Sequence, residues 1–274
     1  MHRRGSAFWL LTGFFALFVL FLYGPTITIT ILSFQGPSGG LTFPMRGLSL
    51  YWFGNLFEKQ MVGDFAGSFQ RSIVLGLAAM VVTVIVSFSA GLAFRKRFRG
   101  SSVVFYLAIA SLIVPSILIS LGIGLLFLVI GVDTAWYSSA FGAHLTWTLP
   151  FGLLIMFAVF NRFDRRYEEA ARDLGATSWQ TIRFVVIPIL LPSLIGVGLF
   201  GFTLSYDEFA RSLYTSGTFN TLPLEIYGMT TNVTTPVLYA LGTLTTAFSF
   251  AIILVSLGVI TILGRRRASR MATA

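Results

Sequence analysis

The chain of 274 residues has no cysteine and only two histidines and two lysines. Without thiols it forms no disulfide and no thiolate metal site, and two histidines are too few for a histidine-rich metal centre. Neither Lys59 nor Lys96 is followed by Ser or Thr, as the P-loop pattern G-x-x-x-x-G-K-[ST] requires. Paired carboxylates and a nucleophile elbow are also missing. The sequence therefore predicts a chain that is not an enzyme and binds no metal or other cofactor of its own.

Charge is scarce as well. Only 11% of the residues are charged, 55% are hydrophobic, and the mean hydropathy is +0.84. A helix needs about 20 apolar residues to cross the hydrocarbon core of a bilayer, which is roughly 30 Å thick. Six stretches meet this length without Asp, Glu, Lys or Arg: residues 8–33, 72–94, 103–130, 138–160, 184–206 and 238–263. Because backbone polar groups must be satisfied within lipid, we predict an all-α integral membrane protein, with residues 1–274 as one six-helix transmembrane domain.

Basic residues are distributed unevenly between the two sides of this arrangement. If the N-terminus is cytoplasmic, 15 of the 19 Lys and Arg residues fall in four inner segments: 1–7, 95–102, 161–183 and 264–274. Such a bias predicts that both termini are cytoplasmic. It also explains the net charge of +9 as a signal of membrane orientation. We therefore expect membrane lipid, and no nucleic acid, around the chain.

The predicted spans carry no carboxylate and no lysine or arginine. Proton-coupled carriers and pumps usually place such residues inside the membrane, where they mark the pathway. A self-sufficient carrier of this kind is therefore disfavoured, although a channel and sodium coupling through backbone carbonyls stay open. If the chain moves a solute, we expect a partner protein to supply the energy.

The inner segment 161–183 contains seven charged residues between positions 164 and 173. Four residues recur at helical spacing and predict one apolar stripe: Tyr167, Ala170, Ala171 and Leu174. Glu168 and Arg172, on the remaining surface, have the spacing of an i,i+4 ion pair. Helices that lie on lipid carry large apolar side chains, whereas two of these four are alanines. A solvated loop is the other alternative, but the pattern favours a helix around which another protein closes.

A second helix is predicted directly after the first. Gly175 can adopt the left-handed conformation that ends a helix. Thr177 and Gln180 have the spacing of a capping box that begins the next one. Pro188 and Pro192 each remove one backbone donor, which predicts a bend at the start of the fifth span. Motion of the short helix would then pass through Gly175 into this span.

At these residues the chain resembles the permease subunits of binding-protein-dependent ABC importers. Their EAA loop reads E-A-A, three residues, G, nine residues, and I-x-L-P. Here EAA stands at 169–171, glycine at 175 and VVIP at 185–188, with the spacing intact. The resemblance implies that a separate ATPase acts on a coupling helix that comprises Tyr167, Glu168, Glu169, Ala170, Ala171, Arg172, Asp173, Leu174 and Gly175.

The resemblance further implies the six-helix bundle of a type I ABC importer permease in the bacterial inner membrane, with a short non-spanning helix before the last span. Two copies of the ATPase would bind ATP and Mg²⁺. A second permease subunit, a paralogue in a heterodimer, would form the other half of the pathway. A periplasmic binding protein would deliver the solute. Residues 143–163 and 202–229 resemble spermidine/putrescine permeases of the second-subunit type. The expected solute is therefore a polyamine, with an amino-acid-like solute or another organic cation as the alternative.

Carboxylates near the outer end of the fifth predicted span would attract the ammonium groups of a polyamine. Asp207 and Glu208 lie there, and a local ion pair with Arg211 is the alternative role for them. Aromatic faces also attract cations, although packing and interface roles are more common. Three aromatic residues are candidates for the pathway: Tyr206, Trp147 and Tyr227.

Overall fold

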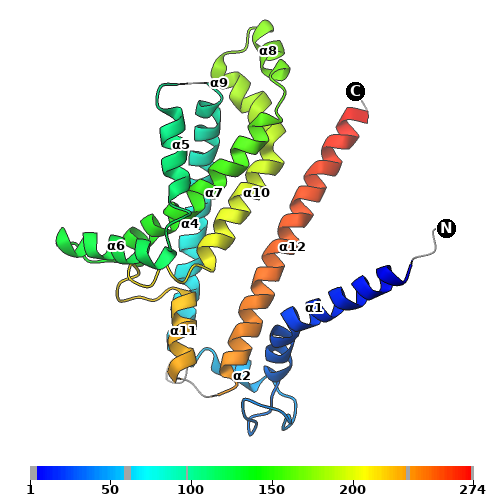
Figure 1. The fold of residues 1–274 in the computed structure, drawn as a ribbon, viewed down its shortest axis with the longest axis vertical. Coiled ribbons are helices and arrows are strands. Elements are labelled where there is room, and N and C mark those ends of the chain that lie inside the picture. The colour runs from blue at the N-terminus through cyan, green and yellow to red at the C-terminus, as the bar shows by residue number, and fades with distance from the viewer. Residues whose placement is uncertain (1–4, 59–62, 97, 233–234, 273–274) are drawn as a thin grey trace. The chain divides into compact units, whose positions relative to one another are not determined.

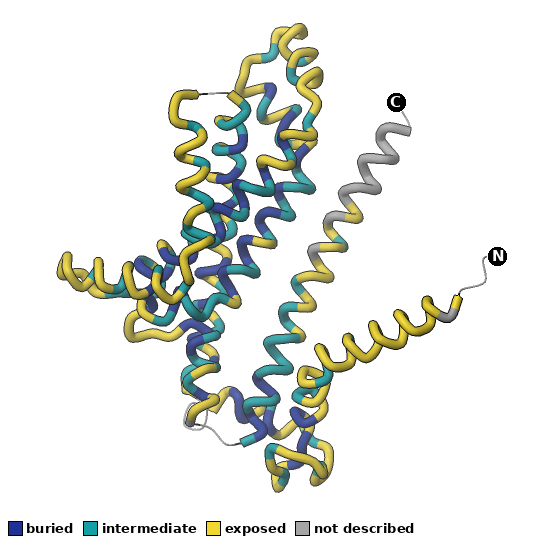
Figure 2. Tube along the Cα trace, in the orientation of Figure 1, coloured by how far each residue is buried: buried dark blue, intermediate teal, exposed yellow. Residues whose placement is uncertain are grey.

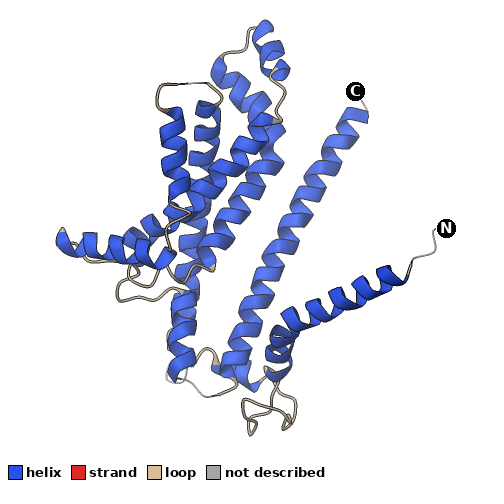
Figure 3. Cartoon of the chain, in the orientation of Figure 1, coloured by secondary structure: helices blue, strands red, loops and turns tan. Residues whose placement is uncertain are grey.

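The computed structural model describes residues 5–58, 63–96, 98–232 and 235–272 (Figure 1). Across these residues the regular secondary structure is helical (Figure 3), and extended backbone pairs only in an isolated bridge between Gln35 and Leu48. The helical class that the sequence predicts is therefore confirmed for the described part of the chain.

The helices carry the labels of Figure 1. In chain order they are α1 (Ser6–Leu32), α2 (Tyr51–Asn55), α4 (Phe65–Phe94), α5 (Ser101–Ala110), α6 (Ser116–Val129), the π-helical η1 (Trp136–Ala140), α7 (Phe141–Asn161), α8 (Arg166–Asp173), α9 (Ser178–Thr181), the π-helical η2 (Ile182–Val186), α10 (Ile187–Tyr206), α11 (Leu222–Asn232) and α12 (Val237–Ala272). They form two compact units. The first comprises Met1–Phe65 with Ile226–Ala251, and the second comprises Ala66–Glu225 with Ile252–Ala274.

Among the described residues, five helical segments are long and apolar enough to cross a membrane. They are Ala7–Leu32, Phe65–Phe94, Trp136–Asn161, Ser178–Tyr206 and Val237–Val259. Each overlaps one of the predicted spans. The short helix α11 before the last of them agrees with what the resemblance implied.

The predicted third span, residues 103–130, is interrupted at Pro115, a residue expected to kink it, and is not one continuous helix. The chain forms α5, breaks, and resumes as α6, which runs across the direction of α5 (Figure 1). Pro115 explains the break: it has no N–H, and in a helix its ring would collide with the carbonyl of Ser111. Its backbone is extended instead, with φ −53° and ψ 130°. The Ser111 hydroxyl donates to the carbonyl of Thr146 at 2.8 Å, which holds the break against α7.

The core of the second unit lies where α4, α7 and α10 pack together (Figure 2). Six buried apolar side chains form its centre: Met156, Phe160, Val186, Leu190, Leu194 and Val197. Small residues allow close approach, since a Cβ at Gly201 would lie 3.3 Å from the Cβ of Thr83. The Thr83 hydroxyl donates to that of Thr148 at 2.8 Å, so buried hydroxyls on α4 and α7 satisfy one another.

The first unit encloses a loop that follows α1. Gln35 is fully buried; its Nε2 donates to the carbonyl of Gly40 at 3.1 Å, and its Oε1 accepts from the Arg46 amide at 2.6 Å. The Tyr239 hydroxyl donates to the carbonyl of Leu41 at 2.8 Å. The start of the long segment between the first two predicted spans is therefore pinned by side chains.

Three of the basic residues that support the predicted orientation, Arg3, Arg4 and Arg97, lie outside the described residues. The orientation with both termini in the cytoplasm stays a prediction.

Replacement of Gly152 tests the close packing of α7 on α4. A Cβ at this position would overlap the Ser87 hydroxyl and lie 2.8 Å from the Cγ2 of Thr83. We expect Gly152→Ala to lower stability by about 1–3 kcal/mol, the usual cost of overpacking, measured by thermal unfolding of the purified chain in detergent. Gly142→Ala, on the same helix with no atom within 4 Å of its Cβ, is the control. Equal stability of the two variants would contradict the packing account.

Candidate functional site

The short helix α8 is formed and ended by residues close to it in sequence. The Asp164 carboxylate accepts the amide N–H of Arg166 at 2.9 Å, at the start of the helix. At its end Gly175 has φ +84° and donates to the carbonyl of Arg172 at 2.8 Å, while Ala176 donates to that of Ala171 at 3.0 Å. This pair of bonds is a Schellman motif, which requires the left-handed residue that glycine supplies. The prediction that Gly175 adopts the left-handed conformation that ends this helix is confirmed.

The chain then enters the fifth span through the predicted capping box. The Thr177 hydroxyl accepts from the Gln180 amide at 3.3 Å, and the Gln180 side chain accepts from the Thr177 amide at 2.8 Å. Helices α9, η2 and α10 follow without interruption over Ser178–Tyr206. Pro188 and Pro192 lie in the first turns of α10, directly after the π-helical turn. Local π-helical adjustments can re-satisfy backbone groups that a proline frees in a membrane helix, and whether these prolines bend the span stays a prediction.

An ion pair ties α8 to the end of α4. Arg95 donates to both carboxylate oxygens of Glu168, at 2.6 and 2.8 Å, and each side chain is only 13% exposed. The Arg95 guanidinium also lies over the rings of Phe160 and Phe163, 5.2 and 5.4 Å from their centres. Arg165 donates to the backbone carbonyl of Arg95 at 3.3 Å. Hydrogen bonds from Arg95 lower the pKa of Glu168 below its ordinary value of 4.5.

The prediction that Glu168 pairs with Arg172 was wrong, since Arg95 takes both carboxylate oxygens. A bidentate guanidinium is a stronger partner than an exposed neighbour on the same helix. Arg95 lies 73 positions away in sequence. The only sequence signal for its role is the basic run that follows the second predicted span.

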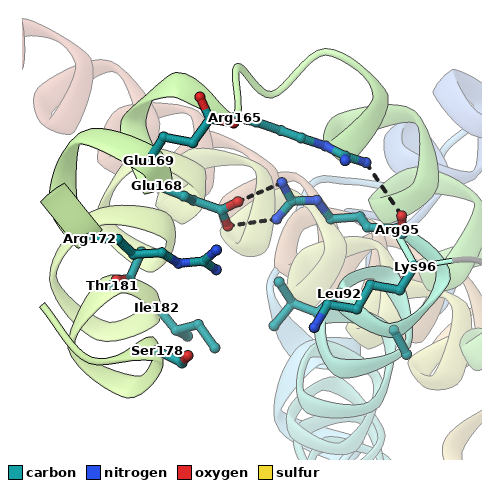
Figure 4. A pocket seen from close by; sticks show the side chains of 11 residues that line it. Leu92, Arg95, Lys96, Arg165, Glu168, Glu169, Arg172, Ser178, Thr181 and Ile182 are labelled. Atoms are coloured by element: carbon teal, nitrogen blue, oxygen red, sulfur yellow. Dashed lines mark hydrogen bonds and ion pairs between the residues drawn. The ribbon is translucent and has the colours of Figure 1, made fainter.

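A cavity of about 440 Å³ opens beside this ion pair, between the end of α4 and α8–α9 (Figure 4). Its lining combines four basic and two acidic side chains with smaller residues: Leu92, Ala93, Arg95, Lys96, Arg165, Glu168, Glu169, Arg172, Ser178, Thr181 and Ile182. Three residues of the predicted coupling helix, Glu168, Glu169 and Arg172, thus share a cavity with residues at the end of α4 that the EAA pattern does not contain.

The large side chains of the apolar stripe of α8 are mostly exposed. The helix has no buried residue, Tyr167 is 56% exposed and Leu174 is 89% exposed. A second hollow of about 330 Å³ adjoins the end of the helix and is lined by Leu174, Gly175, Ala176, Gln180, Phe184 and Val185. Large apolar side chains beside a hollow on a charged surface are typical of a protein-docking site.

At the other end of α10, Glu208 and Arg211 do not form the expected ion pair between side chains. Glu208 accepts the backbone N–H of Arg211 at 3.0 Å, and Asp207 is exposed. The Arg211 side chain is 0% exposed and turns inward, with its guanidinium 4.7 Å above the ring of Trp147. It donates to the hydroxyl of Thr146, to the Ala143 carbonyl and to the Ser116 hydroxyl.

Two of the three aromatic candidates pack against other side chains. Tyr206 is buried and stacks on Phe202, with ring centres 5.7 Å apart, and one face of Trp147 is covered by Arg211. Tyr227, on α11, belongs to the other compact unit and is 55% exposed. Packing, the alternative role, therefore accounts for Tyr206 and Trp147 in this structure.

Residues 83–269 match the model of a protein family described as the binding-protein-dependent transport system inner membrane component. The chain belongs to this family. It is 30% identical over 252 residues to the spermidine/putrescine transport system permease protein PotC of Haemophilus influenzae, covering 92% of this chain and 96% of that protein. It is 28% identical over 232 residues to the putrescine transport system permease protein PotI of Escherichia coli, covering 82% and 81%.

Solved structures agree on the fold of this permease. A bacterial transporter that imports the acidic polysaccharide alginate has a chain that matches with a TM-score of 0.63 at 16% identity, over 98% of this chain and 99% of that one. A chain of the MetNI methionine transporter matches with a TM-score of 0.54 at 18% identity, over 72% and 96%. The protein is therefore an ABC importer permease and a multi-pass membrane protein, and its relatives are transport subunits rather than enzymes.

The permease also contains a buried histidine, for which the sequence favours a packed or hydrogen-bonded role over one that faces the pathway. His144 is 1% exposed; its Nδ1 lies 2.8 Å from the Ser205 hydroxyl and its Nε2 lies 2.8 Å from that of Ser212. The prediction is confirmed. The residue joins α7 to α10 and to the loop that carries Arg211.

Glu168→Gln tests the contribution of the Arg95 ion pair. Loss of a bidentate, charge-assisted interaction should lower stability by about 2 kcal/mol at neutral pH. Because the folded-state pKa of Glu168 is depressed, its stabilisation is present above pH 4.5 and is lost as the pH falls through the folded value. The difference between wild type and variant in thermal unfolding should therefore stay constant down to about pH 4.5 and shrink below it.

The neighbouring variant Glu169→Gln is the matched control, because no ion pair of Glu169 is found among the described residues. Its stability should stay within about 0.5 kcal/mol of wild type. A Glu168→Gln difference that keeps its full size at the lowest pH would show that the carboxylate charge is not the stabilising feature.

Proposed function

We propose that this permease forms half of a polyamine translocation pathway and that a separate ATPase drives it by docking on α8. The observation that carries the docking assignment is the exposure of Tyr167 and Leu174 on a helix that has no buried residue. A solvated loop gains nothing from two large apolar side chains held in this way. A partner that covers them gains apolar burial worth about 25 cal/mol per Å².

Two connections would carry force from α8 into the membrane. One runs through Gly175 and the capping box into the uninterrupted helix Ser178–Tyr206. The other is the Arg95–Glu168 ion pair, which leads to the end of α4. Since α4 and α10 both pack on α7, a displacement of α8 would act on one common core. This geometry supports a coupling role for the residues from Tyr167 to Gly175.

The solute assignment is supported by the relatives. Those described above carry the names of spermidine/putrescine and putrescine permeases, and one of them covers nearly the whole chain. Asp207, exposed, and Glu208, half-buried, lie just beyond α10 and suit a cationic solute. The fold alone does not select the solute, because structural neighbours import methionine and alginate. Another small organic cation is the alternative.

The remaining partners follow from the same proposal. Two copies of the ATPase would hold ATP and Mg²⁺, and a paralogous second permease subunit would complete the pathway in the bacterial inner membrane. A periplasmic binding protein would deliver the solute from the side of Asp207 and Glu208, with both termini of this chain in the cytoplasm. The solved alginate transporter was captured with such a periplasmic protein.

Two variants test the docking assignment. Gly175→Pro imposes a φ near −65° where the chain requires +84° and should disconnect α8 from α9. Glu169→Arg reverses an exposed charge without disturbing packing. In each case we expect solute uptake by the assembled transporter to fall to background and co-purification of the ATPase to fall at least roughly tenfold, as for the loss of a central interface residue. Permease levels in the membrane should be unchanged.

Arg162→Gln, an exposed change outside α8, is the control and should leave uptake and ATPase binding as in wild type. Normal uptake in both test variants would refute docking on α8.

The double variant Asp207→Asn, Glu208→Gln tests the solute pathway. Removal of two negative charges should raise the KM for putrescine or spermidine uptake roughly tenfold, because the local attraction for the cation is lost. Glutamine can still accept the Arg211 amide, so the fold is preserved. Asp133→Asn, another exposed carboxylate of the same unit, is the control. Identical transport kinetics in the double variant and wild type would remove these residues from the pathway.

A further inference from the structure

The cavity beside α8 has an excess of positive charge that the ion pair does not use. Four cationic side chains line it against two carboxylates. One carboxylate, Glu168, is already bound at both oxygens by Arg95. No hydrogen bond or ion pair of the Lys96 ammonium or the Arg172 guanidinium is found among the described residues. Figure 4 shows both side chains directed into the space between α8 and the end of α4.

The cavity has the size and the donors of a site for a small anionic group. Its volume of about 440 Å³ falls within the range of about 300–1,000 Å³ that is usual for ligand pockets. The Arg172 guanidinium offers planar, paired N–H donors that suit a phosphate, and Lys96 offers a compact positive charge. The Ser178 hydroxyl, in the same lining, supplies a further donor. Leu92 and Ile182 provide an apolar floor.

We propose that this cavity binds a phosphate group between Lys96 and Arg172, supplied by an anionic phospholipid headgroup or by free phosphate. The proposal rests on the proposed cytoplasmic position of residues 161–183. Basic pockets between membrane helices on that side are the usual sites for anionic headgroups. A phosphate there bridges α8 to the end of α4 in parallel with Arg95 and Glu168. Its presence therefore changes how firmly the coupling helix is held.

Phospholipid retention by the purified full-length permease, without its ATPase, tests the first source. Native mass spectrometry in a neutral detergent, with added phosphatidylglycerol or phosphatidylcholine, gives the affinity of each lipid. The variant Lys96→Gln, Arg172→Gln should bind phosphatidylglycerol about 30-fold more weakly, as the attraction of two basic residues to an anionic leaflet implies. Phosphatidylcholine should be unaffected. These two side chains form no bond in the structure, so the variant should fold.

The second source is tested with inorganic phosphate. Thermal unfolding in neutral detergent, with chloride at equal ionic strength as the reference, should show stabilisation of the wild type by phosphate and none of the variant. The matched control for both arms is Arg162→Gln, Arg166→Gln, which removes two charges from exposed positions outside the cavity. If the test variant loses only its binding of phosphatidylglycerol, the phosphate group belongs to a lipid headgroup. If it loses only its stabilisation by inorganic phosphate, the ligand is the free anion.

Equal phosphatidylglycerol binding in wild type, test variant and control, with no effect of phosphate, would overturn the proposal. Equal losses in test and control variants would do so too, because they would reflect net charge alone. Unchanged anion binding with weaker ATPase binding would instead assign the cavity to an acidic side chain of the ATPase, which also overturns it. Since both arms use the permease alone, failure of the docking assignment on α8 leaves their results unchanged.

Discussion

The bidentate contact between Arg95 and Glu168 holds in place a helix that could not hold itself. Helices shorter than about 12 residues are marginal in water, and α8 has eight residues, none of them buried. Its caps satisfy backbone groups but do not fix its direction. Direction comes from the ion pair, from the Arg165 bond to the Arg95 carbonyl and from the contact of Tyr167 with Phe163. The Arg95 guanidinium is itself packed on the rings of Phe160 and Phe163, which limits the motion of the ion pair.

This arrangement reconciles two opposed requirements. A docking helix must leave its apolar side chains uncovered, yet a lever must be firmly joined to what it moves. In this permease a charged face joins α8 to the end of α4, and the large apolar side chains of the stripe stay exposed, as the proposed docking of a partner would require. The ion pair connects α8 to a core in which glycines bring helices close together. There the hydroxyls of Thr83 on α4 and Thr148 on α7 form a hydrogen bond. Close-packed interiors have low compressibility and transmit strain, so the proposed displacement of α8 would be passed on to this core.

The features that the sequence predicted correctly are those determined within a few positions. The left-handed Gly175, the box of Thr177 and Gln180, and the spacing of the EAA loop depend on residues that are near neighbours in the chain. The partner of Glu168 was missed because it lies 73 positions away, and no spacing rule links the two. Pro115 was expected to kink the third span, but hydropathy alone does not show that the helix stops there. Its effect depends on the backbone it interrupts and on Ser111, which bonds to α7. The orientation of the Arg211 side chain also depended on tertiary contacts that no local pattern reveals.

Two arginines of the second unit, the partly buried Arg95 and the fully buried Arg211, have different hydrogen-bond partners. Both guanidinium groups lie over aromatic rings. Arg95 forms an ion pair with the Glu168 carboxylate, whereas Arg211 donates to hydroxyls and a backbone carbonyl. Because the Arg211 guanidinium donates to neutral acceptors, it forms no ion pair with the nearby carboxylate of Glu208 in the described part of the chain. Glu208 gives one oxygen to a backbone amide and keeps its negative charge unpaired with Arg211. An outward turn of the arginine would have placed its positive charge against Glu208, where the proposed cationic solute would approach. The inward turn of Arg211 is therefore a structural condition for a negative surface at the end of α10.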